Sequence, residues 1–109
     1  MSWEEFLWHM EHRLGMYVGR PTYERAFSML TGFALARGQG ELAAFQEWMS
    51  ARHPGSPLVF SSLALAETFG MGAIEDDLVS DDDHKRAVSN LCRLFREFLG
   101  QHASTAHHR

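Results

Sequence analysis

The apolar pattern of residues 80–100 constrains the fold of this chain more than any other feature. Apolar side chains recur there every three or four positions, which gives a helix one continuous apolar side. Ser80 occupies the N-cap position, and Gly100 follows the last apolar residue. The stripe consists of Ala87, Val88, Leu91, Leu94, Phe95, Phe98 and Leu99. Such a stripe is stable only when other elements cover it, so we expect a helical bundle built around it.

Apolar patterns and helix-start signals in the remainder of the sequence predict four further helices. The expected helices span residues 2–14, 22–37, 40–52 and 57–69. Ser2 followed by Glu5 forms a capping-box pattern for the first helix. Ser56 and Pro57 suit the N-cap and first position of the fourth helix. The apolar run 58–60 also fits a strand, and periodicity alone leaves that alternative open.

These patterns predict an all-α fold. We expect a compact single-domain bundle of about five helices over residues 1–100, followed by a flexible, disordered tail at 101–109. A chain of 109 residues buries roughly 65% of its unfolded surface. No apolar run approaches the ~18 residues of a membrane span, and the acidic start of the chain does not resemble a secretory signal. We therefore expect a cytoplasmic protein with no membrane partner.

Charge is strongly segregated along the chain. Residues 75–83 carry six acidic and no basic residues, whereas residues 84–109 carry one acidic and five basic residues. The formal net charge is −4, and no basic stripe with interleaved aromatic residues is present, so nucleic acid is not an expected partner. The acidic run either supports a helix start and keeps a loop solvated, or it forms a recognition surface for a basic protein.

We take the acidic run and one tryptophan as candidate partner-binding residues. The acidic candidates are Glu75, Asp76, Asp77, Asp81, Asp82 and Asp83. Trp8 falls on the side of the first helix that it shares with Glu5 and His12, opposite the apolar stripe. An exposed tryptophan is enriched at binding hot spots. The alternative is that a following loop residue, such as Tyr17, folds over the Trp8 ring.

No motif for a metal, a cofactor or a reaction is present. Glu5, His9 and His12 lie on one helix side, but their order differs from that of a zinc protease and no fourth ligand is apparent. Cys92 falls within the apolar stripe, so we expect a core residue rather than a nucleophile. The sequence predicts a non-enzymatic protein without cofactors. An enzyme that assembles its histidines and acids by folding, around His9, His12 or His84, stays open.

The junction between the first two helices is unusually apolar and rich in glycine. It reads "HRLGMYVG" from residue 12 to 19. This stretch resembles the Arg-Pro-x-Met-Tyr-x-Gly motif of a family of small bacterial proteins, with Arg13, Met16, Tyr17 and Gly19 as the matching residues. Leu14 stands in place of the proline of that motif. The similarity continues through Gly32 and Phe33, through "FQEW" at 45–48 and through "LFREFL" at 94–99.

The resemblance implies an intracellular partner of a bacterial toxin, that is, an immunity protein. It carries no catalytic residue. Within the motif, we expect Met16 and Tyr17 to turn back into the core, and Gly32 to permit the close approach of a neighbouring backbone. The alternative is that Tyr17, Arg20 and the amides near Gly19 form a pocket or a partner contact.

Two functions from different classes follow from these observations. The first is a cytoplasmic immunity-type inhibitor that covers the active site of a basic toxin domain with residues 75–83. The second is a small helical sensor or regulatory module that binds a small ligand in an aromatic pocket between helices. The sequence leaves the oligomeric state open.

Overall fold

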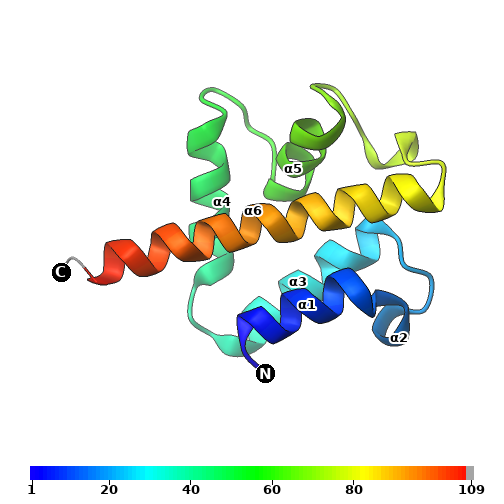
Figure 1. Cartoon of the computed structure of the whole chain (residues 1–109). Coiled ribbons are helices and arrows are strands. Elements are labelled where there is room, and N and C mark those ends of the chain that lie inside the picture. The colour runs from blue at the N-terminus through cyan, green and yellow to red at the C-terminus, as the bar shows by residue number, and fades with distance from the viewer. Residues whose placement is uncertain (108–109) are drawn as a thin grey trace.

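The expected long C-terminal helix is the axis of the fold. In the computed structural model, which describes residues 1–107 and the side chains of residues 1–102, this helix runs along the length of the molecule (Figure 1). The elements are α1 (Trp3–His12), α2 (Leu14–Val18), α3 (Tyr23–Arg37), α4 (Glu41–Arg52), α5 (Phe60–Phe69), the 3₁₀ turn η1 (Glu75–Asp77) and α6 (Asp81–His107). The described residues contain no strand, so the all-α prediction is confirmed.

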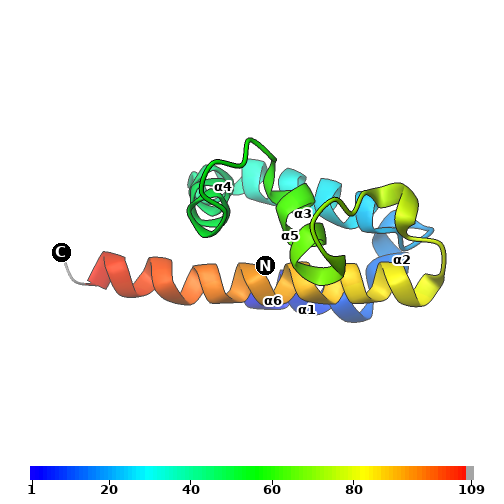
Figure 2. The same ribbon diagram turned by 90° about the horizontal axis from the view of Figure 1, so that it is seen from above.

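The apolar stripe of α6 is covered by the other helices, as expected. α1 lies antiparallel alongside α6, and α3 and α4 form a second layer above them (Figure 2). Leu91, Cys92, Leu94 and Phe95 are completely buried. Phe95 lies 4.5 Å from the ring of Trp3 and 4.6 Å from the ring of Phe45, measured between ring centroids. These aromatic contacts join α1, α4 and α6 at the centre of the core.

Helix α6 continues beyond Gly100, where the sequence predicts its end. The ring of His102 stacks on that of Phe98, with centroids 5.2 Å apart, and Gln101 Oε1 accepts a hydrogen bond of 2.8 Å from Trp48 Nε1. These contacts with α4 and along α6 hold the turn after Gly100, so the expected helix end there is wrong. The side chains of residues 103–107 and all of residues 108–109 lie outside the described part of the chain, and with them most of the expected tail.

The first expected helix is divided into two. α1 ends at His12, because Arg13 leaves helical geometry with φ −136° and ψ 22°. The chain then forms the short helix α2, which begins at the buried Leu14 and ends at Gly19. Gly19 has a φ of 77° and donates its N–H to the carbonyl of Gly15. The prediction of one helix over 2–14 is therefore wrong in its last turn, whereas the Ser2 cap is confirmed.

Helix α5 begins three residues later than Pro57, at Phe60. Gln46 of α4 holds the preceding segment in an extended path, since its Oε1 accepts the Phe60 N–H at 2.6 Å and its Nε2 donates to the Leu58 carbonyl at 3.3 Å. A side chain that is distant in sequence thus replaces the expected cap at Ser56. Leu58 and Val59 lie in this extended segment, and their side chains are exposed.

A charged cluster ties α4 to α5. Glu67 accepts two hydrogen bonds from Arg52, at 2.7 Å and 3.1 Å, and lies 2.7 Å from Nε2 of His53. The hydrogen bonds from Arg52 lower the pKa of Glu67 below its usual value, with His53 adding to the effect and burial opposing it. The ionised form of Glu67 therefore stabilises the fold.

Replacing Glu67 by Gln is expected to lower the free energy of unfolding by about 1–2 kcal/mol at neutral pH, because the charge-assisted hydrogen bonds are lost. The pKa of Glu67 is lower in the folded protein than in the unfolded chain, where it is near 4.5. The contribution of Glu67 to the free energy of unfolding is therefore complete above pH 4.5 and is lost as the pH falls through the lower pKa of the folded protein. Urea unfolding of both proteins from neutral to acid pH should show a shrinking difference. A difference that stays constant with pH would contradict this account, and Glu47→Gln serves as the exposed control.

Candidate functional site

The acidic segment at residues 75–83 divides into residues that stabilise the backbone and residues that are free. Asp77 Oδ2 accepts the Ile74 N–H at 3.0 Å. Asp83 Oδ2 accepts the N–H groups of Ser80 and Val79 at 3.3 Å and 3.2 Å, and these hydrogen bonds lower the pKa of Asp83. The hydroxyl of Ser80 accepts the Asp83 N–H in return, which completes a capping box. Both carboxylates therefore have a local structural role.

Three acidic side chains are exposed and make no described hydrogen bond or ion pair. They are Asp76, Asp81 and Asp82, whereas Glu75 is half-buried. Asp76 belongs to η1, and the other two belong to the first turn of α6. This part of the chain lies at the same end of the molecule as α2 (Figures 1 and 2). The structure thus brings the acidic candidates, including these three exposed ones, to the end that also carries the junction motif.

Trp8 is exposed, with 45% of its surface accessible. The guanidinium of Arg13 lies 5.7 Å from the centre of the Trp8 ring, and the His12 ring lies 4.9 Å away. Tyr17 does not cover Trp8; its hydroxyl lies 3.3 Å from Nδ1 of His9 instead. The α1–α2 corner therefore presents a tryptophan, a tyrosine and an arginine, the residue types that dominate binding hot spots.

The expected insertion of the junction into the core is wrong. Met16 is 76% exposed and Tyr17 is 53% exposed, whereas Leu14 is buried. Successive residues of an α-helix lie about 100° apart around its axis, so Met16, two positions after the buried Leu14, lies on the opposite side of α2. The Sδ of Met16 lies 3.8 Å from the Arg13 guanidinium, on the outside of the molecule. The motif residues are thus available to a partner.

A hollow of about 740 Å³ lies between the α1–α2 corner and the start of α6. Its lining includes the buried side chains of Met10, Leu14 and Val88 together with the exposed charges of Arg13, Asp81 and Lys85. The free carboxylate of Asp81 and the junction motif therefore share one concave surface. We call the α1–α2 corner together with this hollow the corner surface.

Gly32 does not mark a close helix approach. A Cβ atom added there would meet no atom of a neighbouring element within 4 Å, so the sequence expectation for this glycine is wrong. Gly32 instead lines a second hollow of about 420 Å³, together with His9 and Tyr17 of the α1–α2 corner. The corner is thus flanked by hollows on two sides.

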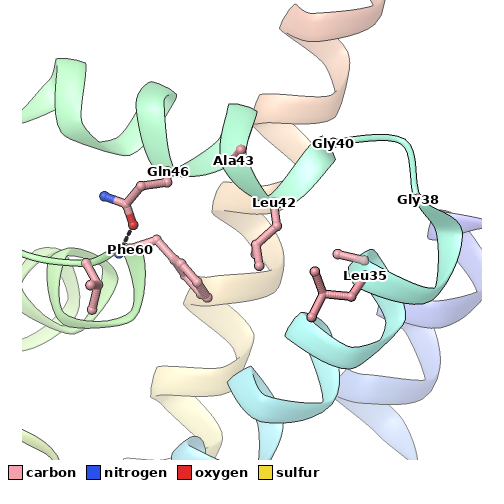
Figure 3. Close-up of a pocket in the computed structure, with 9 residues that line it drawn as sticks. Leu35, Gly38, Gly40, Leu42, Ala43, Gln46 and Phe60 are labelled. Atoms are coloured by element: carbon pink, nitrogen blue, oxygen red, sulfur yellow. Dashed lines mark hydrogen bonds between the residues drawn. The ribbon is translucent and has the colours of Figure 1, made fainter.

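A third concave surface was missed by the sequence analysis. An apolar groove of about 530 Å³ lies between α3, α4 and α5, where the side chains of Leu35, Leu42 and Phe60 converge (Figure 3). Leu35 is 69% exposed, and Val59 also lines the groove. The late start of α5 exposes Val59, and this start depends on Gln46, so no local pattern announces the groove.

The neighbours of the candidate metal ligands and of Cys92 show what these side chains do in the fold. Within the described residues, no group of three or more His, Cys, Asp or Glu side chains is placed to hold a metal ion. Glu5 serves the α1 capping box, and its hydrogen bonds with Ser2 lower its pKa. Cys92 is buried, as expected, and burial raises the pKa of its thiol. No helix in the described part of the chain has the length and apolar character to cross a membrane.

The comparisons with protein-family models, curated proteins and solved structures give no match. The resemblance to small bacterial immunity proteins therefore stays a prediction.

Replacing Met16 by Ala should change the free energy of unfolding by no more than about 0.5 kcal/mol, because an exposed side chain contributes little to packing. Replacing the neighbouring Leu14 by Ala should cost about 2–5 kcal/mol, because Leu14 is buried. Denaturant unfolding of the two variants measures this contrast. A similar loss in both would mean that Met16 packs into the core after all.

Proposed function

We propose that this chain is a non-enzymatic protein-binding module of the immunity type, which inhibits a bacterial toxin in the cytoplasm by covering its active site. The observation that carries the proposal is the corner surface. Its hollow combines an apolar floor with exposed charges, and the exposed Trp8 lies outside that lining but next to Arg13 and His12, which belong to it. An anchor side chain on a partner would be desolvated there, which is the condition that makes a contact strong.

The electrostatics of the corner surface refine the expected partner. Asp81, Arg13 and Lys85 give the hollow charges of both signs, and Asp76 and Asp82 add exposed negative charge outside its lining, in η1 and in the first turn of α6. A complementary partner therefore presents mainly basic residues with an acidic residue opposite Arg13 or Lys85. A toxin active site that binds an anionic substrate has such a basic surround. The inhibitor would occupy it as a protein, without any reaction of its own.

The test is co-expression of the tagged chain with the products of neighbouring genes, followed by growth and affinity measurements. The proposal expects that the chain restores growth to cells that produce one of these products and forms a stoichiometric complex with it. Trp8→Ala should weaken this complex at least tenfold, as truncation of an anchor residue costs about 2 kcal/mol or more. The matched control is Glu47→Gln, an exposed change on α4, which should leave the affinity unchanged.

The charge contribution is tested separately. A variant with Asp76, Asp81 and Asp82 replaced by Asn keeps Asp77 and Asp83, so the backbone caps remain. Its association rate should fall and lose most of its salt dependence, since steering by surface charge is screened by salt. Full affinity in both the Trp8 variant and this variant would place the binding surface elsewhere.

The apolar groove favours a second function, a sensor of small apolar ligands. Apolar side chains from three helices line it, and Gln46, the amide side chain in the lining, is engaged with Ser50 and with the segment before α5. A ligand there would gain mainly from the burial of apolar surface.

We expect a medium-chain fatty acid such as decanoate, used as the probe, to raise the thermal midpoint of the protein if the groove is a ligand site, because a ligand that binds only the native state stabilises it. Leu35→Asn should abolish the increase, since Leu35 is an exposed member of the groove wall. Leu58→Asn, a change of the same kind at an exposed leucine outside the groove lining, is the control. An unchanged midpoint with decanoate argues against this second function.

A further inference from the structure

Glu41 is a buried carboxylate with one unsatisfied oxygen. Its Oε2 accepts a hydrogen bond of 2.7 Å from Trp3 Nε1 and lies 3.5 Å from Nε of Arg37. Its Oε1 has no hydrogen-bond partner within the described part of the chain and is shielded from solvent. A buried acceptor without a donor costs free energy, so such an atom in a folded protein calls for an explanation.

Glu41 lines a hollow at the end of the molecule opposite the corner surface. The hollow has a volume of about 500 Å³ and is lined by Arg37, Gln39, Glu41 and His102. These residues come from the end of α3, the loop after it, the start of α4 and the part of α6 that follows Gly100. Glu41 is buried, and the other three are exposed, so their side chains can move to admit a ligand to Glu41.

Arg37 supplies the complementary charge. Its guanidinium lies 5.6 Å from the centre of the Trp3 ring and 5.7 Å from that of Phe33, which holds it over the core. Its one ion pair with a described residue uses Nε, at 3.5 Å from Glu41. The two terminal amino groups make no hydrogen bond within the described residues. Arg37 therefore retains donors for an anion directly beside the unsatisfied acceptor of Glu41.

A ligand that satisfies both groups needs an N–H donor with positive charge and, next to it, a negative acceptor. A simple anion would be repelled by Glu41, a simple amine would leave Arg37 without an acceptor, and a metal ion would find too few ligands. An α-amino acid carries its ammonium and its carboxylate on the same carbon atom, which matches adjacent opposite charges. We propose that this pocket binds a free α-amino acid, with the ammonium on Glu41 Oε1 and the carboxylate on the terminal amino groups of Arg37.

This binding site is independent of the proposed inhibitor function, because it shares no residue with the corner surface. Occupancy of the pocket would tie the end of α6, through His102, to the α3–α4 connection. The ligand would also act directly on the Trp3–Glu41 hydrogen bond, which joins α1 to α4. The indole N–H of Trp3 is therefore a reporter for the site.

The experiment is a titration of the full chain with glycine and then with each of the common protein amino acids, followed by calorimetry and by the indole N–H signals in NMR spectra. Binding should shift the signal of Trp3 and leave that of Trp8 unchanged, because Trp8 lies in the corner surface. Glycine betaine, a zwitterion with no N–H donor, is the matched ligand control. It should bind at least about tenfold more weakly than the preferred amino acid, since a charged hydrogen bond is lost.

Glu41→Gln keeps an acceptor for Trp3 but removes the charge that holds the ammonium, so its affinity should also fall about tenfold or more. Glu47→Gln, on the exposed side of α4, should bind like the unaltered protein. If Glu41→Gln does not fold, the comparison of amino acid with betaine on the unaltered chain still decides the matter. The absence of binding by every amino acid, equal binding of betaine, or a shift of Trp8 instead of Trp3 would each overturn the proposal.

Discussion

The packing of Phe95 between Trp3 and Phe45 is the interaction on which the rest of the structure depends. Phe95 lies on the apolar stripe of α6, Trp3 begins α1 and Phe45 lies in the middle of α4. Aromatic pairs of this kind contribute about 0.5–1.5 kcal/mol each beyond the burial of their area. Because these rings meet at one point, α6 serves as a common axis, and the helices around it are placed by their contacts with its stripe.

This arrangement determines where concave surfaces form. A single long helix cannot be covered to both of its ends by shorter helices, so each end of α6 borders a hollow. At the start of α6, Asp81 and Lys85 meet the α1–α2 corner. At its other end, His102 meets the α3–α4 connection and the buried Glu41. The two proposed binding regions are thus consequences of the mismatch between the length of α6 and that of its neighbours.

Much of the fold was predictable because its signals are local. The caps at Ser2 and Ser80 lie within three residues of the groups that they satisfy, and the stripe of α6 repeats with the period of the helix. The errors fall where contacts distant in sequence decide the outcome. Gln46 sets the start of α5, and contacts with Phe98 and Trp48 carry α6 past Gly100. No pattern within the local sequence contains these contacts.

The candidate sites were predictable only as residue types. The exposure of Trp8 agrees with its position opposite the apolar stripe, and the acidic run was visible from composition alone. The division of that run into capping and free carboxylates required the loop geometry, since Asp77 and Asp83 are chemically identical to Asp76 and Asp82. The apolar groove and the unsatisfied Glu41 oxygen each arise where helices distant in sequence meet.

The separation between core and surface has a consequence for how the proposed binding surface can change. The core contacts of α6 use Leu91, Leu94 and Phe95, whereas the corner surface exposes Trp8, Met16 and Asp81, which contribute little to packing. Substitutions at the exposed positions can therefore alter partner choice at small cost in stability. Under the proposed inhibitor function, the side chains that contact the partner are therefore free to change while the core contacts of α6 stay the same.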